Sequence, residues 1–264
     1  MERIINKMKM PVLFVGHGFP ENALEVNVYT KNWKKLAEAI PRPKTILCVS
    51  AHWYREDTSV TAMENPKTIH DFYGFPEELY GIEYAAKGSL EYAEKIVKLI
   101  RSVKVKKNYE WGFDHGTWSV LRNMYPEADI PVLQLSLNYY ASLKTQYQIG
   151  KELKPLRDEG ILIIGSGNLV HNLMKINYSG KPYDWAIDFD KYIQKNLEAR
   201  TDEVLINYTS EKTSSLAHPT NEHYLPLMYV LGAAENESPQ FFNEIIFAAS
   251  ISMRCALFGL NINS

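Results

Sequence analysis

The sequence predicts a single α/β domain in three layers, with helices on both faces of a mixed, mostly parallel central sheet. Three apolar runs, at 12–15, 46–49 and 161–164, are typical of strands that are buried on both faces. Segments with helical spacing alternate with these runs, as they do in parallel sheets. The 264 residues show no repeat, linker or low-complexity tract, so we expect one domain over 1–264.

Each further element is predicted from its own pattern. The first helix, for example, carries Trp33, Leu36, Ala37 and Ile40 on one face, and Pro41 ends it. Alternating stretches near the edges predict added antiparallel strands, the first of them beside the second strand. We expect strands at 11–17, 45–49, 59–63, 103–109, 131–137, 161–164, 241–248 and 252–258, and helices at 33–40, 90–100, 120–124, 141–156, 185–200 and within 216–234.

The composition excludes several classes of protein. Lys and Arg number 29 against 31 Asp and Glu, and this net charge of −2 argues against binding to nucleic acid or to an anionic membrane. No stretch approaches the roughly 20 apolar residues of a membrane span. Cys48 and Cys255 lie in apolar segments and are expected to be buried and unpaired. Residues 1–10 do not form a convincing signal peptide, so we expect a cytoplasmic protein, as a monomer or small homo-oligomer.

Seven histidines dominate the candidate site. His17, His52 and His171 follow the three buried strands, whose ends meet at one edge of a parallel sheet. His171 is expected in the first turns of a helix. His115 lies in a turn where Asp114 or a backbone carbonyl is expected to fix its tautomer. Neutral imidazoles suit Zn, Fe, Ni or Cu, so the pattern indicates a metal site.

The remaining histidines are less clearly placed. His218 and His223 are five residues apart, which does not put them on one face of a helix, so only one is expected to reach the metal. His223, at the start of the last helix, is the better candidate, and the neighbouring Glu222 competes with it. A phosphate-binding turn at 16–18 and a serine nucleophile at Ser166 remain weaker alternatives.

Six short motifs, in order, carry a resemblance over nearly the whole chain. They are GHGFP at 16–20, SAHW at 50–53, IHDFYGFP at 69–76, DHGTW at 114–118, GSGNLVHNL at 165–173 and HPTNEHYLPL at 218–227. With this set the sequence resembles the class III extradiol ring-cleaving dioxygenases, most closely their DOPA-4,5-cleaving branch. The resemblance implies a LigB-like fold.

The resemblance also implies a role for each histidine. His17, His52 and His223 look like the metal ligands. His171 looks like the acid/base, close enough to the metal to act as a fourth ligand. His115 looks like the residue that hydrogen-bonds bound oxygen or the substrate oxyanion.

The implied reaction is the opening of a catechol ring, as in DOPA, beside its two hydroxyls, with Fe(II) and O₂. Residues 66–82 form a long aromatic segment, and we expect it to cover the substrate with His70, Phe72 and Tyr73. Because three neutral imidazoles favour Zn²⁺ over Fe²⁺, we expect zinc in protein purified in air. A zinc-dependent hydrolase or lyase, and a non-catalytic metal-binding relative, are the alternatives.

Overall fold

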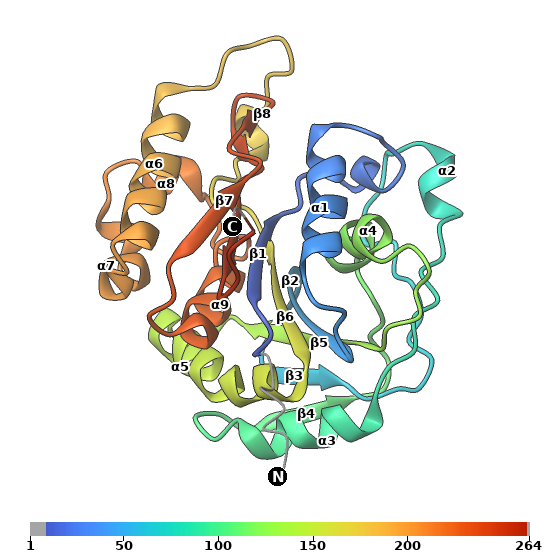
Figure 1. The fold of residues 1–264 in the computed structure, drawn as a ribbon. Coiled ribbons are helices and arrows are strands. Elements are labelled where there is room, and N and C mark those ends of the chain that lie inside the picture. The colour runs from blue at the N-terminus through green and yellow to red at the C-terminus, as the bar shows by residue number, and fades with distance from the viewer. Residues whose placement is uncertain (1–8, 263–264) are drawn as a thin grey trace.

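An eight-stranded sheet lies between two layers of helices in the computed structural model, which describes residues 9–262 (Figure 1). The strand order is β4-β3-β5-β2-β6-β1-β10-β7. The strands are β1 (Val12–Gly16), β2 (Thr45–Arg55), β3 (Thr58–Thr61), β4 (Val105–Asn108), β5 (Val132–Asn138), β6 (Ile161–Gly167), β7 (Pro239–Phe242) and β10 (Cys255–Phe258). β8 (Ile246–Phe247) and β9 (Ile251–Ser252) form a separate two-stranded sheet.

The helices cover both faces of the large sheet (Figure 1). They are α1 (Val28–Ala39), α2 (Glu77–Tyr80), α3 (Leu90–Leu99), α4 (His115–Met124), α5 (Leu143–Leu153), α6 (Asp184–Glu198), α7 (Asp202–Ile206), α8 (Ser214–Ala217) and α9 (Pro226–Ala234). Four 3₁₀ turns, η1 (Pro20–Ala23), η2 (Lys154–Glu159), η3 (Leu173–Lys175) and η4 (Tyr208–Ser210), lie between them. The predicted layered α/β fold is therefore confirmed.

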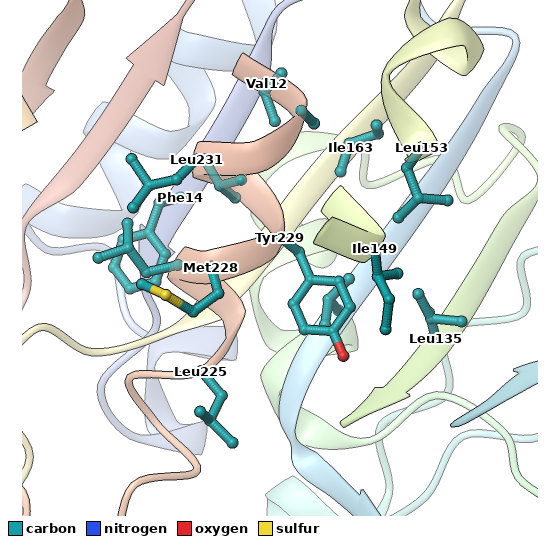
Figure 2. Packing of buried hydrophobic residues seen from close by; sticks show 14 of the residues in the cluster. Val12, Phe14, Leu135, Ile149, Leu153, Ile163, Leu225, Met228, Tyr229 and Leu231 are labelled. Carbon is teal, nitrogen blue, oxygen red and sulfur yellow. The ribbon is translucent and has the colours of Figure 1, made fainter. Parts of the chain in front are cut away.

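The central strands are apolar on both faces because each face has its own core. In β1, Val12 and Phe14 pack with α5, α6 and α9, whereas Leu13 and Val15 pack with α1 and α4. Figure 2 shows the first of these cores, where the α9 side chains lie beside Val12 and Phe14. This two-sided burial explains why the strands appear in the sequence as continuous apolar runs.

The register of the three central strands brings their carboxyl ends to one level. β6 pairs in parallel with β1, where Gly16 lies opposite Gly167, and with β2, where Ser50 lies opposite Ser166. Side chains that follow Gly16 and Ser50 must therefore emerge together at this edge, as expected for a ligand site in an α/β protein.

Some predicted elements differ from the structure. Residues 59–63 do not pair with β2, because β5 occupies that side of β2; instead β3 is antiparallel to β5. The strand predicted at 241–248 is broken at Asn243, whose φ of 53° is incompatible with a continuous ladder, and yields β7 and β8. The last helix begins at Pro226, so His223 precedes it.

The prediction of a helix at His171 is wrong. The chain bends at residues 169–170, and His171 makes an isolated antiparallel bridge with Ile251. The backbone N–H of His171 donates to the carbonyl of Ala217, at 2.9 Å. These partners come from remote parts of the chain, which is why local spacing did not reveal them.

Two expectations from composition can be compared with the structure. Cys48 and Cys255 are buried free cysteines, as predicted. None of the helices within 9–262 has the length and apolar character needed to cross a membrane. Most of the N-terminal segment considered as a signal peptide, residues 1–8, lies outside the described residues.

Candidate metal centre and active site

Five histidine rings meet at the edge of the sheet where β1 and β6 end. His52 was expected to follow its strand, but β2 runs on to Arg55 and contains it. The rings of His17, His52 and His223 form a nearly equilateral triangle, with centroid separations of 5.0, 5.1 and 5.3 Å. His115 lies beside His52, at 3.8 Å, and His171 lies beside His223, at 3.4 Å. The convergence that was predicted from three strand ends is thus present, with two further rings added.

His17 directly follows β1 and is held by a serine of the neighbouring strand. Its Nδ1 lies 3.0 Å from the Ser166 hydroxyl, and that hydroxyl donates its only proton to the carbonyl of Gly116, at 2.5 Å. Ser166 can therefore only accept from His17, so the ring carries its proton on Nδ1. The lone pair of Nε2 then faces the other histidines and is free for a metal.

His52 lies within β2, where the strand departs from regular pairing with β5 between Val49 and Tyr54. Its Nε2 is 3.1 Å from Nε2 of His17. Two lone pairs at this distance repel each other unless a proton or a cation lies between them. The donor set of neutral imidazoles therefore fits a divalent metal of the zinc, iron, nickel or copper kind.

His223 reaches the cluster through a close contact between a turn and the end of β6. Its carbonyl accepts a hydrogen bond from the N–H of Asn168, at 2.9 Å. A Cβ built at Gly167 would lie only 2.1 Å from that carbonyl oxygen, so glycine is required there. On the other side, Nδ1 of His223 lies 3.1 Å from the carboxylate of Glu222, which orients the ring.

His115 begins α4 and is held by Asp71, a residue that the sequence analysis did not single out. The Asp71 carboxylate accepts from the backbone N–H of His115, at 2.8 Å, and lies 2.9 Å from its Nδ1. The same carboxylate lies 3.4 Å from Nδ1 of His52. Asp114, which together with a backbone carbonyl was a candidate to fix the tautomer, instead caps α4 and accepts a hydrogen bond from Ser50.

His171 differs from the other four rings. It stacks on His223 with an interplanar angle of 9°. Among the described residues, no side-chain or backbone group forms a hydrogen bond with its ring, although its backbone is anchored. Its ring is thus the one in the cluster that remains free to exchange a proton with a ligand.

Burial keeps four of the rings uncharged. It lowers the pKa of His17, His52 and His223 well below the usual value, and repulsion from other histidines of the cluster adds to the effect. Burial also lowers the pKa of His171 to about 3. Neutral imidazole is the form that binds metals, so the cluster is ready for one at pH 7.

Asp71 provides the negative charge beside the rings. Burial on its own raises the pKa of this carboxyl, but hydrogen bonds from His115 and the nearby His52 outweigh burial and lower it to about 2. Asp114, fully buried, has its pKa raised to about 6 by burial and by the charge of Asp71.

A cavity of about 230 Å³ opens directly onto the cluster. His52, His115, His171 and His223 form its polar wall, and Phe72, Tyr73 and Phe75 of the aromatic segment, with Phe19 and Leu173, form its apolar wall. The space can therefore hold a flat ring against the histidines.

Two histidines lie away from this cavity. Nε2 of His70 lies 3.0 Å from the carbonyl of Ile82, and His70 lines a different cavity. His218 is buried among Phe189, Tyr208 and Tyr224, with Nε2 at 2.9 Å from the carbonyl of Leu169.

A protein-family model described as the catalytic LigB subunit of aromatic ring-opening dioxygenase matches residues 13–258. The chain belongs to this family. LigB-type relatives include the 4,5-DOPA dioxygenase extradiol of Escherichia coli K12, which is 47% identical over 242 residues. The match covers 89% of this chain and 89% of that one. The protein of the same name from Beta vulgaris is 38% identical over 241 residues, covering 85% of this chain and 87% of that one.

A solved structure agrees with the LigB assignment. The crystal structure of an uncharacterized protein from Escherichia coli K12 matches with a TM-score of 0.83 and 42% identity, over 95% of this chain and all of that one. The LigB-like fold is thereby confirmed. The chain is an extradiol aromatic ring-opening dioxygenase, an oxidoreductase, as the resemblance implied.

Two sets of side chains in this LigB-type site have the spacing of a metal site. One is His17, His52 and His115, and the other is His171, Glu222 and His223; within each set the ligand atoms lie within 4.8 Å of one another. His17 and His52 lie in the first set, and His223 lies in the second.

Proposed function

We propose that this chain opens the ring of a DOPA-like catechol by 4,5-cleavage, using Fe(II) held by His17, His52 and His223. The nearly equal spacing of these three rings carries the proposal. Each of the three also has a polar group behind its Nδ1: Ser166, Asp71 and Glu222 respectively. Such partners direct Nε2 of a histidine toward a metal.

The metal would supply the chemistry that the side chains lack. When bound, Fe(II) polarises the two catechol hydroxyls and lowers their pKa, and it brings O₂ to the substrate. The balanced reaction joins one O₂ to one catechol, breaks the ring bond beside the hydroxyls and leaves both oxygen atoms in a muconic semialdehyde. With DOPA the product is a seco-DOPA that can cyclise.

His171 is proposed to take a proton from a catechol hydroxyl. It lines the cavity, stacks on the proposed ligand His223 and makes no hydrogen bond through its ring within the described residues. A base must be free and within reach of the proton that it removes.

The substrate ring is proposed to lie against Phe72 and Tyr73 of the aromatic segment. Phe72 already packs edge-on against His115, with centroids 5.6 Å apart, and Tyr73 is 92% exposed at the mouth of the cavity. His70 stays a prediction as a substrate-binding residue.

The resting metal is a separate question. Three neutral imidazoles leave the full charge of the ion uncompensated and favour Zn²⁺ over Fe²⁺. We therefore expect protein purified in air to carry zinc and to be inactive until Fe(II) replaces it under anaerobic conditions. Elemental analysis of both preparations, together with O₂ uptake, tests this. Protein that binds no transition metal even after reconstitution would contradict the proposed centre.

Oxygen consumption with a panel of catechols tests the substrate. The Fe(II)-loaded protein is expected to consume O₂ with L-DOPA and to yield the ring-opened product. Uptake with simple alkyl catechols but none with DOPA would refute the DOPA-like assignment and leave the ring-opening class intact.

A further inference from the structure

Within residues 9–262, Asp71 is the one carboxylate that lies behind two histidines of the cluster at once. It belongs to the aromatic segment 66–82, far in sequence from His52 and His115. Its two oxygens make three contacts: to the backbone N–H of His115 at 2.8 Å, to Nδ1 of His115 at 2.9 Å and to Nδ1 of His52 at 3.4 Å. A carboxylate only accepts hydrogen bonds, so Nδ1 of His115 is favoured as the donor, and the negative charge nearby also favours a proton on Nδ1 of His52.

We propose that Asp71 is a positioning residue, which sets the proton of His115 and His52 on Nδ1 and so turns both Nε2 lone pairs toward the metal and substrate. For His52, the Nε2 lone pair is the one proposed to bind metal. For His115, an unprotonated Nε2 accepts a hydrogen bond from a catechol hydroxyl; it does not donate one to bound oxygen. The part concerning His52 rests on the proposed metal centre, whereas the part concerning His115 does not.

The location of Asp71 supports this role. The carboxylate is largely enclosed, with 15% of its side chain exposed, and it lies at the N-terminus of α4, where unpaired N–H groups and the helix dipole favour a negative charge. The next residue in the chain, Phe72, lines the cavity. The residue that orients the histidines thus belongs to the segment that is proposed to hold the substrate.

The comparison of Asp71→Asn with Asp71→Ala separates this role from simple anchoring. Asparagine has the shape of aspartate, but its NH₂ group donates hydrogen bonds where aspartate has an accepting oxygen. The backbone N–H of His115 cannot become an acceptor, so the amide oxygen stays there and the NH₂ group faces the two rings. The rings then take their protons on Nε2, where a metal cannot bind.

The first measurement is the affinity of metal-free protein for Co(II), with the visible absorption of the bound ion as the readout. Asp71→Asn is expected to weaken binding by roughly 10- to 100-fold, the usual effect of losing a partner behind a ligand, and by more than Asp71→Ala. Asp71→Glu, which keeps a carboxylate, should recover part of the loss. Thr68→Ala is the matched control, because Thr68 anchors the same segment by accepting from the N–H of Tyr84, at 2.8 Å, and lies outside the cavity that the cluster lines.

The second measurement needs neither metal nor a folded variant. Nitrogen NMR of the ring of His115 in metal-free wild-type protein is expected to show its proton on Nδ1. A proton on Nε2 would overturn the inference, as would an asparagine variant that binds Co(II) better than the alanine variant or a Thr68→Ala loss as large as that of Asp71→Asn. If the wild-type protein binds no Co(II) at all, the proposed metal centre fails, and the His115 tautomer still decides the role of Asp71.

Discussion

The two halves of the histidine cluster are built differently. His17 follows β1 and His52 lies in β2, on either side of β6, and their Nε2 atoms face each other at 3.1 Å. His171 follows a bend and His223 lies within a turn, and their rings lie flat on each other at 3.4 Å. The first arrangement directs two lone pairs at one point, which suits holding an ion. The second leaves His223, the third proposed ligand, anchored by Glu222 and leaves His171 free, which suits moving a proton beside the ion.

Removing a ring from the first half is expected to have the largest effect. His17→Ala should weaken metal binding by far more than about 100-fold, since even a partner of a ligand contributes 10- to 100-fold, and activity should be lost with the metal. Metal content after dialysis against Fe(II) or Co(II) measures this. His70→Ala is the matched control for metal content, because its ring lies outside the cluster; equal metal loss in both variants would contradict the assignment.

Removing the free ring of the second half should separate binding from turnover. His171→Ala is expected to keep its metal and to lose about 10²- to 10⁴-fold in kcat, the usual contribution of a general base. Metal content and oxygen uptake are measured on the same sample. If metal content falls as it does in His17→Ala, His171 is a ligand, and the contrast between the halves disappears.

A smaller effect is expected when the support of His17 is removed and the ring is kept. Ser166→Ala frees the His17 tautomer and should weaken metal binding by roughly 10-fold, at the lower end of such effects. Ser119→Ala is the matched control, since Ser119 is equally buried but its hydroxyl has no partner. Affinities of the two variants that agree within error would show that Ser166 does not orient His17.

The smallest predicted effect concerns pH. Burial lowers the pKa of His17, His52 and His223 in the folded state, so the unfolded chain takes up protons first as pH falls below about 6.5. The free energy of unfolding is therefore unaffected by protonation of these rings above that pH and decreases below it, because the unfolded chain binds more protons than the folded chain. The melting temperature of metal-free protein should therefore fall by several degrees between pH 7.5 and 5.5.

His218→Gln serves as the comparison for this pH effect. The pKa of His218 is lowered to about 4 by burial, and the ring lies outside the cluster. Its replacement removes one of the buried titrating groups, so the fall in melting temperature should become smaller. An unchanged or rising melting temperature at pH 5.5 in the wild-type protein would refute the explanation.

The sequence was sufficient for the three central strands and for the place where the site lies. The apolar runs that form β1, β2 and β6 are buried on both faces, and such runs are specified locally. Because parallel strands end at a common edge, the convergence of His17 and His52 followed from their positions alone. The family resemblance supplied the roles, which spacing could not.

The parts that were missed depend on contacts between remote segments. Asp71 lies next to His70 in a segment without regular periodicity, and only the folded chain brings it behind His115. The motif IHDFYGFP contains Asp71, so the one available signal was an acidic residue inside a matched motif. The bridge between His171 and Ile251 likewise joins residues 80 positions apart.

The most direct test of the central claim is oxygen consumption by protein loaded anaerobically with Fe(II) and then mixed with L-DOPA in air-saturated buffer. We predict one O₂ consumed for each catechol ring lost, a ring-opened product identified by mass spectrometry, and no consumption by His17→Ala. Full Fe(II) occupancy without oxygen consumption, or oxygen consumption that leaves the catechol ring closed, would contradict the proposed function.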